Sequence, residues 1–256
     1  ALDLAYAQAM LALARANPAS DDLAALAAES AMNTTPWNYW DEDGEPRPLI
    51  GDAVGLLEKV MARSPAHPQA AHLYIHLLEL HDARRAEAAA DRLRKHGPKH
   101  LAHLVHMPAH IYYRLGRYAD SIDANADAVA AEEAYLREVG DDGLVRYGYY
   151  PHNVHFLLTS AQMMGDVHTI VSQTAKLERI LDVETGRELY WVQAIYAAPY
   201  YAYAEYSSPE AILALTDEAH PLEYVDAMRH YARAIAFSQQ GAQATFTAQV
   251  SAIETL

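Results

Sequence analysis

The sequence contains no cysteine among its 256 residues. This absence excludes disulfide bonds, thiolate metal sites and cysteine nucleophiles. Long apolar runs are missing as well, and none approaches the roughly 18 residues that a membrane-spanning helix needs, so we expect no membrane partner. Positive charge is scarce, since 19 Lys and Arg stand against 34 Asp and Glu and give a formal net charge of -15. We therefore expect no nucleic-acid partner, because a phosphate backbone repels such a chain.

Glycine and phenylalanine are also sparse, with 11 and 3 residues against 18 tyrosines. Ala, Leu and Tyr carry most of the 52% hydrophobic content. This composition favours helix over sheet, and no segment alternates apolar and polar residues with period two. We therefore predict an all-α fold. The length suffices for one large domain or two small ones.

The chain begins at Ala1 rather than at a methionine. We expect a soluble protein, and this start is compatible with a secreted or periplasmic protein whose signal peptide has been removed.

Periodicity and capping signals predict about 12–13 helices. The first two span 1–16 and about 20–32, the second of them capped by Ser20. Residues 33–49 then form a long irregular segment with two Trp and three Pro, and such segments in compact domains are often functional. A polar link is expected at 140–148. Further helices are expected at 51–63, 68–81, 83–95, 100–115, 117–138, 151–164, 167–182, 187–205, 208–218, 222–239 and 242–255.

The segment AHIYYRLGRYADSIDANADAVA contains a repeat-like pattern of small and aromatic residues around a glycine. It resembles the tetratricopeptide repeat family, with matching residues at Ala109, Tyr112, Gly116, Tyr118 and Ala128. Ser121 and Asn125 depart from that pattern, which usually has alanine and an aromatic residue there. Weaker copies cover most of the chain, two of them hinged at Gly165 and Gly241. The resemblance implies one α-solenoid of helix hairpins over residues 1–256, lacking an N-terminal half-repeat.

Seven histidines form three groups with helical spacing: His72-x3-His76, His103-x2-His106-x3-His110 and His152-x2-His155. Spacings of three, four and seven return to one side of a helix, so each group forms a stripe on one helix face. The first members of the second and third groups both lie thirteen residues before a hinge glycine. In tetratricopeptide proteins these positions face the concave groove, so the resemblance implies that all seven share one surface.

Aligned imidazoles predict a transition-metal site, because imidazole suits Zn, Cu, Fe and Ni. The scarcity of carboxylates in register disfavours Mg and Ca and a carboxylate-bridged di-iron site. Copper is favoured over zinc, and seven imidazoles are enough for more than one ion. Two alternatives remain: a plain polar groove, and a pH-sensitive histidine cluster.

The function that we expect is a copper-type oxidoreductase acting on a small organic substrate in the groove. One alternative is a zinc-dependent hydrolase with a glutamate as base to a metal-bound water. Another is a non-catalytic scaffold that binds a peptide or protein partner. The sequence lacks His-Glu-x2-His, Gly-x-Ser-x-Gly and a phosphate-binding glycine loop. The catalytic candidates are Glu79, Tyr196 and Tyr200, and the groove candidates are Trp37, Trp40, Tyr113, Arg114 and Tyr203.

Overall fold

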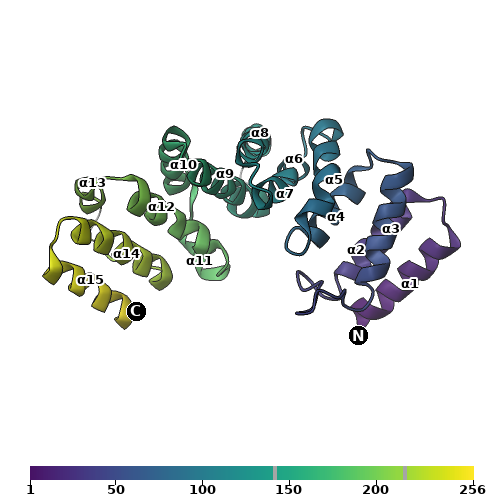
Figure 1. The fold of residues 1–256 in the computed structure, drawn as a ribbon, viewed down its shortest axis with the longest axis horizontal. Helices are drawn as coiled ribbons and strands as arrows, with labels where there is room; N and C mark the ends of the chain where they lie inside the picture. The colour runs from purple at the N-terminus through teal and green to yellow at the C-terminus, as the bar shows by residue number, and fades with distance from the viewer. Residues whose placement is uncertain (141–142, 216–217) are drawn as a thin grey trace. The chain divides into compact units, whose positions relative to one another are not determined.

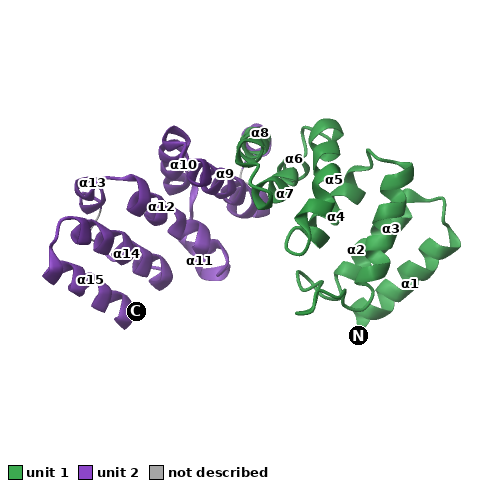
Figure 2. Cartoon of the chain, in the orientation of Figure 1, with its two compact units in different colours: residues 1–131 green, residues 132–256 purple. Residues whose placement is uncertain are grey.

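The computed structural model of the chain describes residues 1–140, 143–215 and 218–256. These residues form α-helices and one π-helix (Figure 1), with no strand beyond an isolated bridge between Trp40 and Pro46. The predicted all-α fold is therefore confirmed. The chain separates into two compact units, residues 1–131 and 132–256 (Figure 2). Each unit is described by itself, and the prediction of one continuous solenoid stays a prediction.

In the first unit, helices that follow one another in the sequence pack side by side. In addition, α4 contacts α7, which places two of the histidine-bearing helices next to each other. The buried core of this unit is built mainly from Ala, Leu, Ile and Val side chains. Its helices are α1 (Leu2–Ala16), α2 (Asp21–Met32), α3 (Ile50–Arg63), α4 (Pro68–Leu78), α5 (Ala83–His96), α6 (Ala102–His106), α7 (Pro108–Arg114) and the first part of α8 (Tyr118–Val139).

The helix predicted at 100–115 is divided in two at Met107. The next residue, Pro108, has no backbone N–H and cannot donate the hydrogen bond that would continue the helix. The amide of Met107 still donates to the carbonyl of His103 (3.1 Å), so the chain passes from α6 into α7 without a loop. The histidines of the second group are thus shared between two short helices.

The second unit repeats the pattern of sequential helix packing. Its short helix α11 was not predicted, and the helix predicted at 187–205 begins only at Val192. The predicted link at 140–148 contains a π-helix, η1 (Val145–Tyr149). Residues 141–142 of this link lie outside the described residues, and so do residues 216–217 of the helix predicted at 208–218. The α-helices are α9 (Tyr150–Met164), α10 (Val167–Ile180), α11 (Val183–Glu188), α12 (Val192–Tyr206), α13 (Pro209–Leu213), α14 (Glu223–Gln239) and α15 (Gln243–Thr255).

The predicted hinge glycines have backbone angles that explain why glycine stands there. Gly116, Gly165 and Gly241 have φ values of 76°, 70° and 70°, in the left-handed region. Glycine enters this region without the steric penalty of a Cβ atom, and a helix often ends on such a residue. The helix-turn-helix hinges are therefore confirmed at all three positions.

Residues 33–49 are irregular, as predicted, and one tryptophan fixes them to the helical body. Trp40 Nε1 donates to the carbonyl of Leu77 at the end of α4 (2.7 Å), and its ring stacks on His81 with centroids 3.8 Å apart. No described helix has the length and apolar character needed to cross a bilayer.

Candidate metal centre

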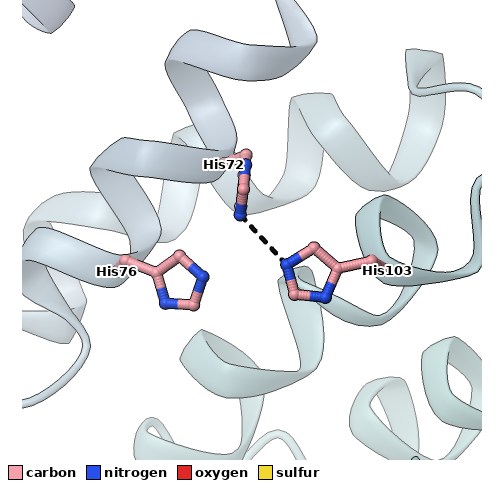
Figure 3. A group of neighbouring side chains, drawn as sticks. All are labelled: His72, His76 and His103. Atoms are coloured by element: carbon pink, nitrogen blue, oxygen red, sulfur yellow. Dashed lines mark hydrogen bonds between the residues drawn. The ribbon is translucent and has the colours of Figure 1, made fainter. Parts of the chain in front are cut away.

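Helices α4 and α6 bring three imidazoles of the first unit together. Figure 3 shows the rings of His72, His76 and His103 facing a common space. One nitrogen from each ring can be chosen so that all three lie within 4.8 Å of one another. The Nε2 atoms of His72 and His103 are 3.1 Å apart, joined by the dashed line in Figure 3. These three residues could hold a metal ion.

The separation of these nitrogens suits coordination of one ion. Nitrogen ligands bind zinc at about 2.0–2.1 Å, so two ligands on a tetrahedral ion lie roughly 3.3 Å apart. The His72–His103 distance of 3.1 Å is close to that value. The ring of His76 completes the set, with centroids 4.9 Å from His72 and 6.0 Å from His103.

Two further imidazoles continue the cluster along α6 and α7. The Nε2 atoms of His106 and His110 are 2.8 Å apart. His106 approaches His103 with ring centroids 6.4 Å apart, and His110 approaches His76 at 5.9 Å. Five of the seven predicted histidines therefore form one contiguous group inside the first unit.

The Nδ1 atoms of four of these five rings face oxygen atoms. His72 Nδ1 is 3.1 Å from Gln69 Oε1, and His106 Nδ1 is 2.6 Å from Asn125 Oδ1. An oxygen acceptor at Nδ1 fixes the tautomer and leaves the Nε2 lone pair for a metal, an arrangement typical of ligating histidines. His110 Nδ1 likewise faces a carboxylate oxygen of Glu79. With protons on both Nδ1 atoms, the bare Nε2 lone pairs of His106 and His110 would repel each other at 2.8 Å, so this pair needs a proton or a metal ion between its nitrogens.

Glu79, at the end of α4, has both carboxylate oxygens engaged by the cluster. His110 Nδ1 lies 2.5 Å from Oε2, and His76 Nδ1 lies 3.3 Å from Oε1. Burial by itself would raise the pKa of Glu79, but the hydrogen bonds from His110 and His76 outweigh it and hold that pKa far below its usual range. The lowered pKa favours the ionised carboxylate, which orients two imidazoles in this place.

The two residues that departed from the tetratricopeptide pattern support the second imidazole pair. Asn125 Nδ2 donates to the backbone carbonyl of Ser121 (2.8 Å), which turns Asn125 Oδ1 toward His106. Both Asn125 and Ser121 are fully buried. The sequence analysis noted Ser121 and Asn125 as departures from the repeat pattern but did not connect them to the histidines. Two polar residues one helical turn apart at core positions indicate a buried hydrogen-bonding partner, and that signal was present in the sequence.

Burial keeps part of the cluster neutral. It lowers the pKa of His72 to about 2 and that of His103 to about 4, and the neighbouring histidines act in the same direction. Neutral imidazole is the form that binds a metal.

An aromatic pocket of about 250 Å³ adjoins the cluster at His76. Trp37 lies edge-on to His76, with ring centroids 6.3 Å apart, and Trp40 forms another wall. The role of both residues in a substrate groove stays a prediction. Sequence reasoning missed Tyr39, Asp41 and His81, which also line the pocket. Their positions follow from the fold of residues 33–49 against α4, which no spacing rule describes.

The structure also describes the other predicted site residues. Tyr113 packs edge-on against Tyr118 (5.5 Å between centroids), and Arg114 is exposed at the end of α7. His152 and His155 are on α9 of the second unit, where His152 lies beside Phe156 and burial lowers the pKa of His155 to about 4.

The remaining predicted tyrosines, Tyr196, Tyr200 and Tyr203, are on α12 of the second unit. Tyr203 donates to Glu178 Oε1 (2.8 Å), while Tyr196 and Tyr200 line a separate pocket. A common surface for these tyrosines and the histidines stays a prediction.

No protein-family model matches this chain, and no curated protein is significantly similar to it. The resemblance to tetratricopeptide repeats therefore stays a prediction.

Proposed function

We propose that the first unit binds a transition-metal ion through His72, His76 and His103. The observation that carries this proposal is the meeting of three imidazole nitrogens within 4.8 Å, two of them at a distance suited to one ion. The oxygen acceptors behind the rings, Gln69 and Glu79, support it, because such partners orient metal-binding histidines. The pair His106 and His110 offers nitrogens for a second ion.

Copper fits this donor set better than zinc. The ligands are all imidazole nitrogens, and the affinity of such a site for Cu²⁺ exceeds its affinity for Zn²⁺. A zinc hydrolase would also need a free base beside the metal-bound water, whereas both oxygens of Glu79 already accept hydrogen bonds from His76 and His110. We therefore assign orientation, rather than proton abstraction, to Glu79.

The pocket beside His76 makes an oxidoreductase the favoured class. Bound copper supplies one-electron chemistry, and the pocket offers a place for a small organic substrate next to it. Trp37 and Trp40 provide aromatic walls, and Asp41 provides a polar group that can orient the substrate. In this proposal the protein positions the substrate at His76, and the imidazoles of His72, His76 and His103 hold the metal.

Elemental analysis of protein purified without a His-tag tests the proposal. We expect at least one equivalent of copper per chain, with the larger part lost in the His72→Ala/His103→Ala variant. The matched control is His96→Ala/His100→Ala, which removes two exposed histidines of the same unit and should retain the metal. Circular dichroism of each variant verifies that the helices remain.

Three outcomes contradict the proposal in different ways. Stoichiometric zinc in place of copper indicates a hydrolase. Equal metal loss in both double variants indicates adventitious binding by surface histidines. Absence of any metal after reconstitution leaves the groove as a binding surface for a peptide or protein partner.

A further inference from the structure

A pocket lined by two arginines lies wholly within the second unit, where the end of α8, the π-helix η1, the start of α9 and the end of α10 meet. Its volume is about 410 Å³, and sites for small organic molecules usually measure about 300–1,000 Å³. The two arginines are Arg137 and Arg146. They are exposed and partly exposed, respectively, so an occupant of the pocket can reach them.

Arg146 is carried by the π-helix η1. The amide of Tyr150 donates to the carbonyl of Val145, five residues back, and such π-turns are rare and often found at functional sites. Arg146 Nη1 donates to the backbone carbonyl of Ile180 at the end of α10 (2.7 Å), and its Cζ lies 5.0 Å from the centre of the Tyr147 ring. These contacts fix the guanidinium in the pocket wall. The bond to Ile180 uses one of its five N–H donors, so donors remain for an occupant.

The charges of Arg137 and Arg146 act on the two ends of one hydrogen bond. Tyr150 donates from its hydroxyl to Glu133 Oε1 (2.8 Å). Burial alone would raise the pKa of Glu133, but hydrogen bonds from Lys176 and Tyr150, together with the charges of Lys176 and Arg137, hold that pKa below its usual value. Burial and the bond to Glu133 raise the pKa of Tyr150, and the charge of Arg146 opposes this rise. Both guanidiniums therefore lie near the same part of the pocket wall.

The pocket carries excess positive charge, although the chain as a whole has a formal net charge of -15. Glu133 is the carboxylate of the lining, and Lys176 Nζ donates to its Oε1 (2.7 Å) and balances its charge. Arg146 also acts on Asp182, but that carboxylate does not line the pocket and accepts from the backbone N–H of Thr185 (2.9 Å). The charges of the two lining arginines are left over, so the pocket favours an anion.

The rest of the lining favours a flat apolar body on that anion. Leu136, Tyr147, Tyr150 and Ile180 contribute to the walls. The hydroxyl of Tyr150 is committed to Glu133, so this residue offers its ring to an occupant. Aromatic rings pack on one another and on guanidinium planes. A guanidinium binds a carboxylate through two parallel N–H···O bonds, which makes a carboxylate a suitable head group.

We propose that this pocket binds a small aromatic carboxylate, whose head group is held by Arg137 and Arg146 and whose ring packs against Tyr147. The proposal is independent of the metal site, because every residue that carries it belongs to the second unit.

A titration of the full chain with benzoate tests this proposal. Benzamide has the same number of non-hydrogen atoms and nearly the same shape without the charge, and inorganic phosphate has charge without a ring. We expect saturable shifts in the methyl NMR signals of Leu136 and Ile180 with benzoate. Benzamide and phosphate should each bind at least tenfold more weakly.

Arg137→Gln should weaken benzoate binding about tenfold, because it removes a charged hydrogen-bond donor from the head group. Arg137 is exposed, so the variant should keep the fold. The matched control is Arg187→Gln, which removes the same charge from an exposed arginine of the second unit outside the pocket and should leave the affinity unchanged.

Four results would overturn the proposal. Absence of saturable shifts with benzoate shows that the pocket does not hold this class of ligand. Equal binding of benzamide shows that charge does not select the occupant, and equal binding of phosphate shows that the ring does not contribute; neither comparison needs a variant. Equal affinities of Arg137→Gln and Arg187→Gln show that Arg137 does not contact the carboxylate.

Discussion

Among single residues, Asn125 shows how a buried amide specifies the state of a neighbouring imidazole. Its Nδ2 is held by the backbone carbonyl of Ser121, so its Oδ1 accepts from His106 Nδ1 (2.6 Å). Both Asn125 and His106 are fully buried. Removing only one of these two partners should cost more stability than removing both, because a single substitution leaves a buried polar group without its hydrogen bond.

Asn125→Leu should therefore lower the free energy of unfolding of the metal-free protein by about 1–3 kcal/mol. The double variant Asn125→Leu/His106→Phe should recover part of that loss, because it removes the unsatisfied His106 Nδ1 but also removes the Nε2 partner of His110. Urea unfolding measures both values. Equal stability of Asn125→Leu and the wild type would show that the amide is not needed to hold His106.

Glu132 of α8 is the clearest buried acid in the second unit. It is 2% exposed, its Oε2 has no hydrogen-bond partner among the described residues, and its neighbour Asn153 is buried as well. Burial raises the pKa of Glu132 from 4.5 to about 8, and repulsion from Glu133 acts in the same direction. Glu132 is therefore protonated in the folded protein at neutral pH and ionised in the unfolded chain.

This difference gives stability a pH dependence of defined sign. Above pH 4.5 the unfolded chain loses the Glu132 proton while the folded state keeps it up to about pH 8, so the contribution of Glu132 to the free energy of unfolding falls as pH rises through this window. Between about pH 6 and pH 8 this contribution should fall by roughly 2 kcal/mol. The lowered pKa values of His72, His103 and His155 act in the opposite direction, so the contribution is measured as the difference between wild type and Glu132→Gln in urea unfolding across this range.

Glu132→Gln should remove this contribution, because a neutral amide does not titrate, so its free energy of unfolding should rise relative to wild type by roughly 2 kcal/mol between about pH 6 and pH 8. The control Glu138→Gln changes an exposed glutamate of the same helix and should follow the wild-type profile. A Glu132→Gln profile parallel to that of the wild type would contradict the assignment.

Among the elements, the irregular segment 33–49 holds two tryptophans in different roles: Trp40 fixes the segment to α4, and Trp37 forms an exposed wall of the pocket. Trp40 is fixed by its hydrogen bond to Leu77 and by stacking on His81. Trp37 is 69% exposed and has φ 55°, a left-handed conformation that costs about 1–2 kcal/mol for a residue with a Cβ atom. A strained, exposed tryptophan beside a pocket is typical of a functional rather than a stabilising residue.

Substitution of the two tryptophans should therefore change the stability of the protein in different ways. Trp40→Ala should destabilise the protein by about 3 kcal/mol, since it removes packing and a hydrogen bond together. Trp37→Gly should be neutral or stabilising by up to about 1 kcal/mol, since it relieves the backbone strain. Thermal unfolding measures both. A Trp37→Gly variant as unstable as Trp40→Ala would show that Trp37 is a structural anchor as well.

At the scale of the whole molecule, the five clustered histidines and the aromatic pocket belong to one compact unit. All of them lie between residues 37 and 110, in the unit formed by residues 1–131. A ligand that binds only the folded state stabilises it by mass action, by about 2.7 kcal/mol at one hundred times the dissociation constant. The proposed metal should therefore stabilise the first unit, which holds it, more than the second unit.

Hydrogen exchange of the full chain with and without copper should show this local effect. Amides of α4, α6 and α7 should gain protection, and amides of α12 and α14 should change much less. The His72→Ala/His103→Ala variant should lose the effect. Equal protection gained in both units would instead indicate ligands from the second unit as well.

The sequence by itself determined the helical class, most helix positions, the hinge glycines and the histidine stripes. These features depend on local rules: periodicity assigns a helix face, and a positive φ favours glycine. Only the tertiary structure decided that His72 meets His103, that Glu79 and Asn125 orient neighbouring rings, and that Trp37 stands beside His76. These contacts join residues up to 39 positions apart, and they depend on how helices pack and how an irregular segment folds back, which spacing along the chain does not specify.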